Sequence, residues 1–348
     1  MSAADPIVFD GHNDTLLSLT RPDRGGGRSF FQRSEVGHID LPRAREGGFG
    51  GGLFAVYIPP ESASEGGAPS LAAAQGPIEL GYALRTAMSM VALLFRLEAQ
   101  SEGWAKVART VGDIEAALEA GVLATVLHFE GGEAIDPELD ALEVFYRAGL
   151  RSLGITWSRA NAFGHGVPLA FPGSPDAGPG LTEAGKALVR GCNRLGIMLD
   201  LSHLNERGFW DVAELTDAPL VATHSCAHAL CPSPRNLTDR QLDAIAESGG
   251  VVGVNFYVAF LRADGQRDTS TPVAEIARHV DYMTQRMGIE HVALGSDFDG
   301  CTISDELRDV AGLPKVMAEL RRMGYDDAAL GQIAHGNWFR VLRETWGG

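Results

Sequence analysis

Short apolar runs rich in β-forming residues alternate along the chain with longer segments of helical pattern. Most of the runs are continuous in Val, Ile and Leu, which is typical of parallel strands covered on both faces. The runs expected to form strands are residues 7–10, 52–58, 123–129, 150–156, 196–202, 218–224, 251–257 and 291–297.

The segments between these runs have a helical pattern, and several close on a glycine just past the expected helix end. The clearest are residues 78–100, 111–121, 181–196, 238–249 and 273–288. Eight strand-then-helix units in series predict one α/β domain over residues 1–348, a (β/α)₈ barrel of TIM type with loop insertions. A doubly wound open sheet is the alternative. Stretches rich in Gly, Pro, Ser or Arg predict surface loops at residues 21–29, 59–70 and 172–180.

Composition and charge narrow the classes of partner. The chain of 348 residues is 45% hydrophobic and 21% charged, an ordinary globular composition. Its net charge of −16 repels nucleic acid and anionic membranes, so neither is expected as a partner. The four cysteines show no CxxC pairing, which favours free thiols in a reducing cytosol.

Targeting signals are not seen in the sequence. The stretch MSAADPIVFDG has no basic region and no long apolar segment, so no signal peptide is expected. No window reaches about 18 uninterrupted apolar residues, so no membrane-spanning helix is expected either. We therefore predict a cytoplasmic protein.

Candidate chemistry gathers where the expected strands end. In barrels of this type the reactive groups lie at the C-terminal ends of the strands. Five of the eight expected strands end in side chains that bind metals or move protons. These side chains are His12 and Asp14, Glu130, His203, His224, and Asp297 with Asp299.

The spacing of these groups favours a pair of metal ions. His12 and Asp14 are two residues apart on an extended chain, so both can reach one cation. His203 and His224 come from neighbouring strands about 4.8 Å apart and can share a second cation, while Glu130 can offer one oxygen to each. Three histidines and two carboxylates are too many for one tetrahedral zinc, but two metals sharing a water can use them all.

Other polar groups near these strand ends are interpreted as structural. A single histidine at a strand end is more often a satisfied polar residue than a ligand. The hypothesis of a metal site therefore depends on all five side chains lying at the same rim of the barrel. His128 precedes Glu130 on the same strand and is expected to face the opposite side. Cys226 and Cys231 flank the end of the strand that carries His224, but sulfur ligation is not expected there.

Seven motifs in order resemble the membrane (renal) dipeptidase family, the M19-type branch of the amidohydrolase superfamily. They are FDGHND, HIDLPRAREGGFGGGLFAVYIP, FEGGEAI, GLTEAGKALVRGCNRLGIMLDLSH, THS…PRNLTD, GVNFY and GSDFDG. Each motif alone is weak, but the series runs from about residue 7 to GNWFRVL near the C-terminus.

The resemblance implies a distorted (β/α)₈ barrel that holds two Zn²⁺ ions. The first zinc would be bound by His12, Asp14 and Glu130, and the second by Glu130, His203 and His224. Many superfamily members bridge their metals with a carbamylated lysine on strand 4. This strand has no lysine here, and Glu130 is the family's substitute.

The resemblance also implies the reaction and the residues around it. A metal-bridging hydroxide would hydrolyse dipeptides of the type L-Xaa-L-Xaa or L-Xaa-D-Xaa that carry a free C-terminal carboxylate. Arg235 matches the residue that grips this carboxylate, and Tyr257 would also contact it. Asp297 matches the proton-handling residue, although strand parity alone leaves Asp299 as an alternative. Relatives commonly form homodimers, and we expect the same here.

The chain departs from the family pattern at one position. Mammalian members have a histidine after the threonine of strand 4, which would polarise the scissile carbonyl, and this chain has Trp157 there. His165 is a nearby substitute. This change keeps open a zinc-dependent N-acyl-amino-acid deacylase or another amidohydrolase as an alternative function. A non-catalytic metal-binding protein is disfavoured by the intact ligand set. The secretory leader and lipid-anchor signal of the mammalian enzyme are not found, which favours a bacterial cytosolic form.

Overall fold

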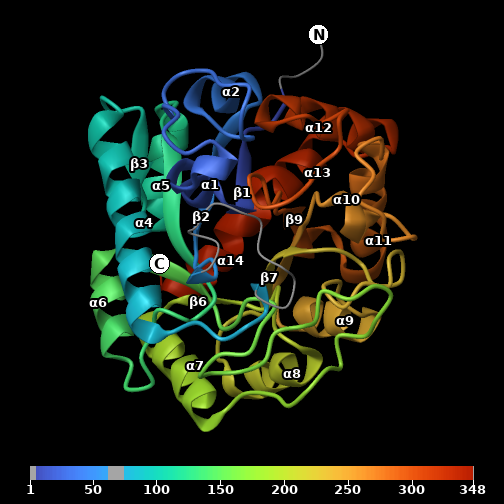
Figure 1. Ribbon diagram of the computed structural model, residues 1–348. Helices are drawn as coiled ribbons and strands as arrows, with labels where there is room; N and C mark the ends of the chain where they lie inside the picture. The colour runs from blue at the N-terminus through green and yellow to red at the C-terminus, as the bar shows by residue number, and fades with distance from the viewer. Residues whose placement is uncertain (1–4, 62–73, 348) are drawn as a thin grey trace.

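The computed structural model describes residues 5–61 and 74–347, and its centre is a parallel β-barrel (Figure 1). Eight strands follow one another around it in the order β1-β2-β4-β5-β6-β7-β8-β9, and β3 pairs with β4 outside this path. The strands are β1 Val8–Asn13, β2 Phe49–Tyr57, β3 Ala105–Val107, β4 Leu123–Glu130, β5 Leu150–Gly154, β6 Met198–Asp200, β7 Val221–Ser225, β8 Val251–Val254 and β9 Val292–Leu294.

Helices surround the strands, with α4 and α6, α7 and α8, and α9 and α11 following one another around the barrel (Figure 1). The α-helices are α1 Thr15–Thr20, α2 Leu41–Glu46, α4 Leu80–Gln100, α5 Val111–Glu119, α6 Asp140–Ala148, α7 Glu183–Leu195, α8 Glu206–Leu215, α9 Asp239–Glu247, α10 Val258–Leu261, α11 Ala274–Met287, α12 Leu313–Arg322, α13 Asp327–Gly331 and α14 Asn337–Trp346. Shorter 3₁₀ turns lie at Pro22–Arg24, Ile289–His291 and Val310–Gly312, and a π-helical turn lies at Gln332–Gly336.

The predicted barrel is confirmed, and the open-sheet alternative is wrong. The first and last strands meet through hydrogen bonds from Asp297 N to His12 O at 2.9 Å and from Asp14 N to Phe298 O at 2.8 Å. An open doubly wound sheet would leave these two edges apart. This seam forms beside the candidate metal ligands, so closing the barrel also assembles that rim.

Each of the eight expected runs overlaps a strand, and the five expected helices form. Thr182 caps α7, accepting a hydrogen bond from Gly185 N at 3.0 Å. Strand β3 was not predicted, because its three residues are shorter than the apolar runs of four to eight that indicate a strand. Most of the expected loop at 59–70 lies outside the described residues, and the single-domain reading of residues 1–348 stays a prediction.

The C-terminal helix α14 packs against residues of strands from all around the barrel. Phe9, Leu53 and Val251 belong to the same buried cluster as Trp338. The Trp338 indole is fully buried and donates its N–H to Leu294 O at 3.1 Å. Gly11 leaves room for it, because a Cβ there would lie 2.4 Å from the indole. The same cluster contains Met198, Val221 and Val251, the first residues of β6, β7 and β8, so α14 packs at the end of the barrel opposite the candidate site.

Among the described residues, α4 is the one helix long and apolar enough by length and composition to cross a membrane. Its residues Ala83, Ala87, Met90, Val91 and Leu94 are buried in the main core cluster. Mostly buried core helices pass the same test, and 33% of the most apolar window of α4 is buried. The absence of a membrane-spanning segment therefore stays a prediction.

Replacing Trp338 by alanine is expected to lower the free energy of unfolding by about 3–5 kcal/mol, the range for truncating a buried aromatic side chain. Denaturant unfolding followed by circular dichroism would measure the change. Trp104→Ala is the matched control, because Trp104 is 47% exposed and its ring lies against Arg45, so the variant should lose about 1 kcal/mol or less. Equal losses in the two variants would contradict the closing role of α14.

Candidate metal centre

Five side chains predicted from the sequence meet at the C-terminal rim of the barrel, and all are buried. His12 lies one residue before the C-terminal end of β1, Asp14 follows that strand, and Glu130 is the last residue of β4. His12 Nε2 lies 3.5 Å from Asp14 Oδ2 and 3.7 Å from Glu130 Oε2. One imidazole and two carboxylates thus form the first potential cation site.

The other oxygen of Glu130 faces two histidines. Oε1 lies 2.9 Å from His203 Nε2 and 3.7 Å from His224 Nε2, and the two Nε2 atoms are 3.0 Å apart. His224 lies in β7, and His203 follows β6 on the neighbouring strand. Glu130 therefore presents one oxygen to each of two groups, which is the arrangement the sequence predicted. Each group has potential ligand atoms within 4.8 Å of one another.

The chemistry of these side chains fits a divalent cation. Within the described part of the chain, both His12 ring nitrogens and Asp14 Oδ1 are buried without a hydrogen-bond partner. Leaving such groups unpaired costs about 1–3 kcal/mol each, more for charged groups. Burial and the Asp14 charge raise the pKa of Glu130 well above its usual range. Burial opposes protonation of His12, but Glu130 and Asp14 outweigh it and raise its pKa to about 10. The cluster thus favours added positive charge.

Two hydroxyl groups orient the imidazoles of His203 and His224. Thr223 Oγ1 lies 2.8 Å from His224 Nδ1 and donates to Asp200 Oδ2 at 2.7 Å. Because the hydroxyl proton is used by Asp200, the hydroxyl oxygen accepts from His224 Nδ1–H. Ser158 Oγ holds His203 Nδ1 in a similar contact at 2.8 Å. With Nδ1 engaged, each ring can turn an Nε2 lone pair toward Glu130, which is the usual way a ligating histidine is oriented.

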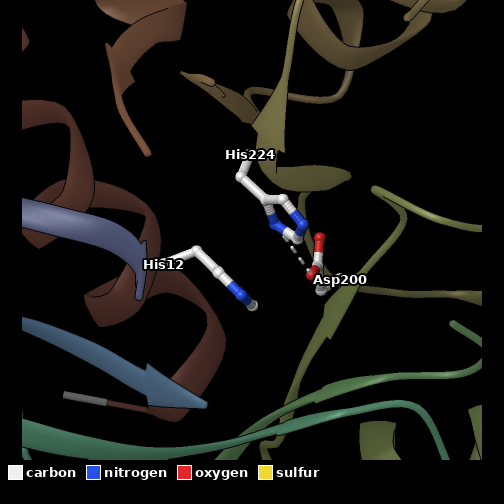
Figure 2. A group of neighbouring side chains, drawn as sticks. All are labelled: His12, Asp200 and His224. Atoms are coloured by element: carbon white, nitrogen blue, oxygen red, sulfur yellow. Dashed lines mark ion pairs between the residues drawn. The ribbon is translucent and has the colours of Figure 1, made fainter. Parts of the chain in front are cut away.

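Asp200 lies beside His224 but is occupied by other hydrogen bonds. Figure 2 shows His12, His224 and Asp200 together, and its dashed line marks the 3.9 Å ion pair between His224 Nδ1 and Asp200. The three could form another cation site by distance. However, Asp200 already accepts from the Ser202 and Thr223 backbone N–H groups and from both hydroxyls. We therefore interpret Asp200 as a support for the histidines.

The expectation that His128 faces away from Glu130 is wrong. The two residues are separated by two positions in β4, so they share a face of the strand. The His128 ring lies 5.2 Å from the His12 ring, and its Nε2 lies 3.7 Å from Asp200 Oδ2. Burial, aided by the His12 charge, lowers the pKa of His128 to about 4. A neutral His128, with Nδ1 held by Ser152 at 2.9 Å, packs beneath the site.

A cavity of about 580 Å³ opens above these groups. Glu130, Asp14 and His203 lie on its wall. It falls in the size range of sites for small molecules, about 300–1,000 Å³. The other side chains that the sequence singled out on its wall are Trp157, Arg235, Tyr257, Asp297 and Asp299.

Arg235 is held at the cavity wall by main-chain acceptors. Its guanidinium donates to the carbonyl oxygens of Ser202 and His224, and its Cζ lies 5.3 Å from the Phe260 ring centroid. The side chain is buried, and Nε has no hydrogen-bond partner among the described residues. The structure thus fixes a positive charge beside His203 and His224, and the Nε–H group of Arg235 remains without a partner.

The structure separates Asp297 from Asp299, which strand parity could not do. Both lie in the turn after β9 with positive φ values of 58° and 67°. Asp297 accepts a hydrogen bond from Asn255 at 3.0 Å, and burial raises its pKa to about 6. Asp299 instead accepts from His38 N at 2.6 Å and lies 3.7 Å from Arg28. Asp299 is thus bound to the loop after α1, and Asp297 is the freer of the two.

The remaining predicted residues have different positions. Tyr257 lies on the cavity wall, where its ring packs edge-on against the Phe260 ring with centroids 4.7 Å apart. The Arg267 Cζ lies 5.8 Å from the centroid of the Tyr257 ring. His165 is not among the described residues that line the cavity. The supporting roles of Thr223, Ser158 and Asp200 were not predicted from the sequence. The one available signal was an Asp or a hydroxyl within apolar strand sequence, where a buried polar group must have a partner.

Comparisons with known proteins agree with this geometry. A sequence profile described as membrane dipeptidase, peptidase family M19, matches residues 3–346. A Klebsiella pneumoniae protein described as an uncharacterized protein in the pqqA 5' region is 55% identical over 256 residues, which are 74% of this chain and 94% of that protein. Dipeptidase tcpJ of Claviceps purpurea is 28% identical over 339 residues, 97% of this chain and 76% of that protein.

A solved structure extends the similarity to the whole fold. A metallopeptidase from Rhodobacter sphaeroides, liganded with a phosphinate mimic of the dipeptide L-Ala-D-Ala, matches with a TM-score of 0.93 and 48% identity. The match covers 99% of this chain and 100% of that chain. The fold that carries the cavity and the candidate metal-binding side chains is therefore shared, over nearly its whole length, with a metallopeptidase.

Thr223→Val should weaken metal binding about 10–100-fold, the usual effect of removing a hydrogen bond that orients a ligating histidine. The substitution keeps the side-chain shape but removes the acceptor for His224 Nδ1. Competition with a chelator of known affinity would measure the change. Thr345→Val is the matched control, because that hydroxyl contacts only Val341 O in α14. Unchanged affinity in Thr223→Val would contradict the orienting role.

Proposed function

This chain belongs to the membrane dipeptidase family, peptidase family M19, and we propose that it hydrolyses dipeptides of the type L-Xaa-L-Xaa or L-Xaa-D-Xaa with two Zn²⁺ ions. Family membership and the shared fold make it a metal-dependent hydrolase of peptide bonds. The observation that carries the finer proposal is the division of Glu130 between two ligand groups. Its Oε2 faces His12 and Asp14, and its Oε1 faces His203 and His224.

The proposed ligands divide into two sets. His12, Asp14 and Glu130 would hold one zinc, and Glu130, His203 and His224 the other. When bound, two zinc ions would supply a hydroxide nucleophile near neutral pH and polarise the carbonyl of the scissile bond. Everything else in the reaction depends on how the protein's own side chains hold the dipeptide and move protons.

Arg235 binds the C-terminal carboxylate of the dipeptide in this proposal. Its side chain is buried, its guanidinium is held by main-chain carbonyls, and the residue lines the cavity. A guanidinium pairs with a carboxylate through charge-assisted hydrogen bonds, which set both affinity and register. A carboxylate anchored there places the neighbouring peptide bond beside Glu130. Tyr257, on the same cavity wall, contacts the same end of the substrate.

Asp297 moves the proton in this proposal. It accepts a proton from the attacking water and passes it to the departing amine, which leaves as the free amino group. A carboxyl with a pKa of about 6 is suited to both steps near neutral pH. Asn255 donates a hydrogen bond to its Oδ2 at 3.0 Å, and Asp297 lies on the wall of the cavity that would hold the substrate.

The Rhodobacter sphaeroides relative supports a dipeptide with a D-residue at its carboxyl end, because its ligand mimics L-Ala-D-Ala. An N-acyl-amino-acid deacylase remains the second candidate. Trp157 favours it, because this indole on the cavity wall replaces the family's histidine with an apolar surface that suits an acyl group. The cytoplasmic location, the homodimer and the lack of nucleic-acid and membrane partners stay predictions.

The first test is a substrate panel measured together with metal content. Purified protein should contain about two zinc ions per chain and hydrolyse free L,L- or L,D-dipeptides, since the ligand set divides into two groups. Chelation should abolish turnover, and zinc should restore it. Faster turnover of N-acyl amino acids than of any dipeptide would favour the deacylase, and one metal per chain would contradict the bridged site.

The second test concerns Arg235. Arg235→Lys should reduce kcat/KM on free dipeptides about 10–100-fold, because a lysine loses the fork of donors but keeps the charge. On C-terminally amidated dipeptides, already poor substrates, the variant and the parent should be similar. Steady-state kinetics on both substrate series would measure this. Arg278→Lys, on the exposed face of α11, serves as control. An equal loss on both series would argue against carboxylate recognition.

A further inference from the structure

Hydrolysis of a peptide bond places negative charge on the carbonyl oxygen, and a donor aimed at that oxygen lowers the barrier. The position expected to supply this donor carries Trp157. Its indole stacks on the His203 ring with centroids 5.7 Å apart and rings inclined by 30°. This contact makes the indole a wall of the site. His165 does not line the described cavity.

Tyr57 is placed where a donor is needed. It is the last residue of β2, and in the parallel register it lies directly beside Glu130 of β4. Neighbouring residues in register project to the same face of a sheet. Tyr57, Glu130 and Trp157 accordingly line the same cavity. The Tyr57 ring also packs edge-on against Trp157, with centroids 5.3 Å apart.

Arg159 holds Tyr57 in place from behind. Its Cζ lies 5.2 Å from the Tyr57 ring centroid and 5.1 Å from the Trp157 ring centroid. The guanidinium is anchored by Glu133 Oε1 at 2.7 Å and by Ile58 O at 2.8 Å, and the pair is almost fully buried. A side chain fixed in this way is already oriented before substrate arrives, which a transition-state donor requires.

The charge beside Tyr57 leaves its proton for the substrate. The Arg159 guanidinium lies over the Tyr57 ring, with Cζ 5.2 Å from the ring centroid. A guanidinium has only donor groups, so it cannot take up the phenol proton, and the Tyr57 O–H remains to donate. Burial raises the pKa of Tyr57 to about 12, so the hydroxyl keeps its proton at neutral pH. The charge of Arg159 also polarises the O–H group toward an acceptor in the cavity.

We propose that Tyr57 is a catalytic residue, whose hydroxyl donates a hydrogen bond to the scissile carbonyl oxygen as that oxygen becomes negative. The proton stays on Tyr57, and the bond strengthens as the carbon becomes tetrahedral. The proposal rests on the proposed function, since it needs a carbonyl seated between Arg235 and Glu130. It gives the site a donor that the change to Trp157 would otherwise remove.

The test is Tyr57→Phe, which removes one oxygen atom and keeps the ring. Its kcat on the best dipeptide should fall about 10²–10³-fold with KM changed only a few-fold, as when an oxyanion donor is lost. Affinity for a phosphinate dipeptide, whose tetrahedral group mimics the transition state, should fall at least about tenfold, with zinc content unchanged. Tyr325→Phe, which removes a hydroxyl bound to Asp281, should behave as the parent protein does.

Each outcome has a defined meaning. Parental kcat and phosphinate affinity in Tyr57→Phe would overturn the proposal. Loss of bound zinc in that variant would also overturn it, because Tyr57 would then serve the metal site. If Trp157→Phe shows the kcat loss and Tyr57→Phe does not, the indole N–H is the donor instead. Failure of the unmodified protein to hydrolyse any dipeptide would refute the proposed function and is distinguishable from all of these.

Discussion

Glu130 is the residue on which the organisation of the site depends. It is a buried carboxylate at the end of a central strand, with one oxygen toward His12 and the other toward His203. Burial alone makes such a charge costly, and a second carboxylate, Asp14, lies in the same cluster. The arrangement is stable when positive charge sits between these groups. This electrostatic requirement explains why histidines from three strands converge on one acidic side chain.

The barrel supplies the rigidity that this convergence needs. Parallel register sets Glu130 between Tyr57 on β2 and Gly154 on β5. Closure between the first and last strands brings Asp297 to the backbone of His12. At the opposite end, the α14 indole fills the space left by glycines. Packing at one end and polar chemistry at the other are thus separated along the same strands, as is usual in this fold.

Hydroxyl, carboxylate and guanidinium side chains around the candidate ligands hold the groups of the site in position. Thr223 and Ser158 hold Nδ1 atoms of His224 and His203, and Asp200 receives the Thr223 proton. Arg159 with Glu133 performs a comparable task for Tyr57 on the other wall. These contacts explain how flexible side chains remain oriented around a cavity large enough for a small substrate.

The sequence by itself determined the strand order, the barrel class and the five residues of the candidate metal centre. The period of apolar residues, the strand length and the residue types at strand ends are local properties of the sequence. Parallel strands then bring their C-terminal ends to one rim of the barrel. The spacing of two residues in β4 already puts His128 on the face of Glu130. Only the tertiary structure decided which Glu130 oxygen faces which histidine and how Asp297 differs from Asp299. It also revealed Arg159 behind Tyr57, although the two are about a hundred positions apart. Such pairings depend on rotamers and on barrel closure, which no local pattern encodes.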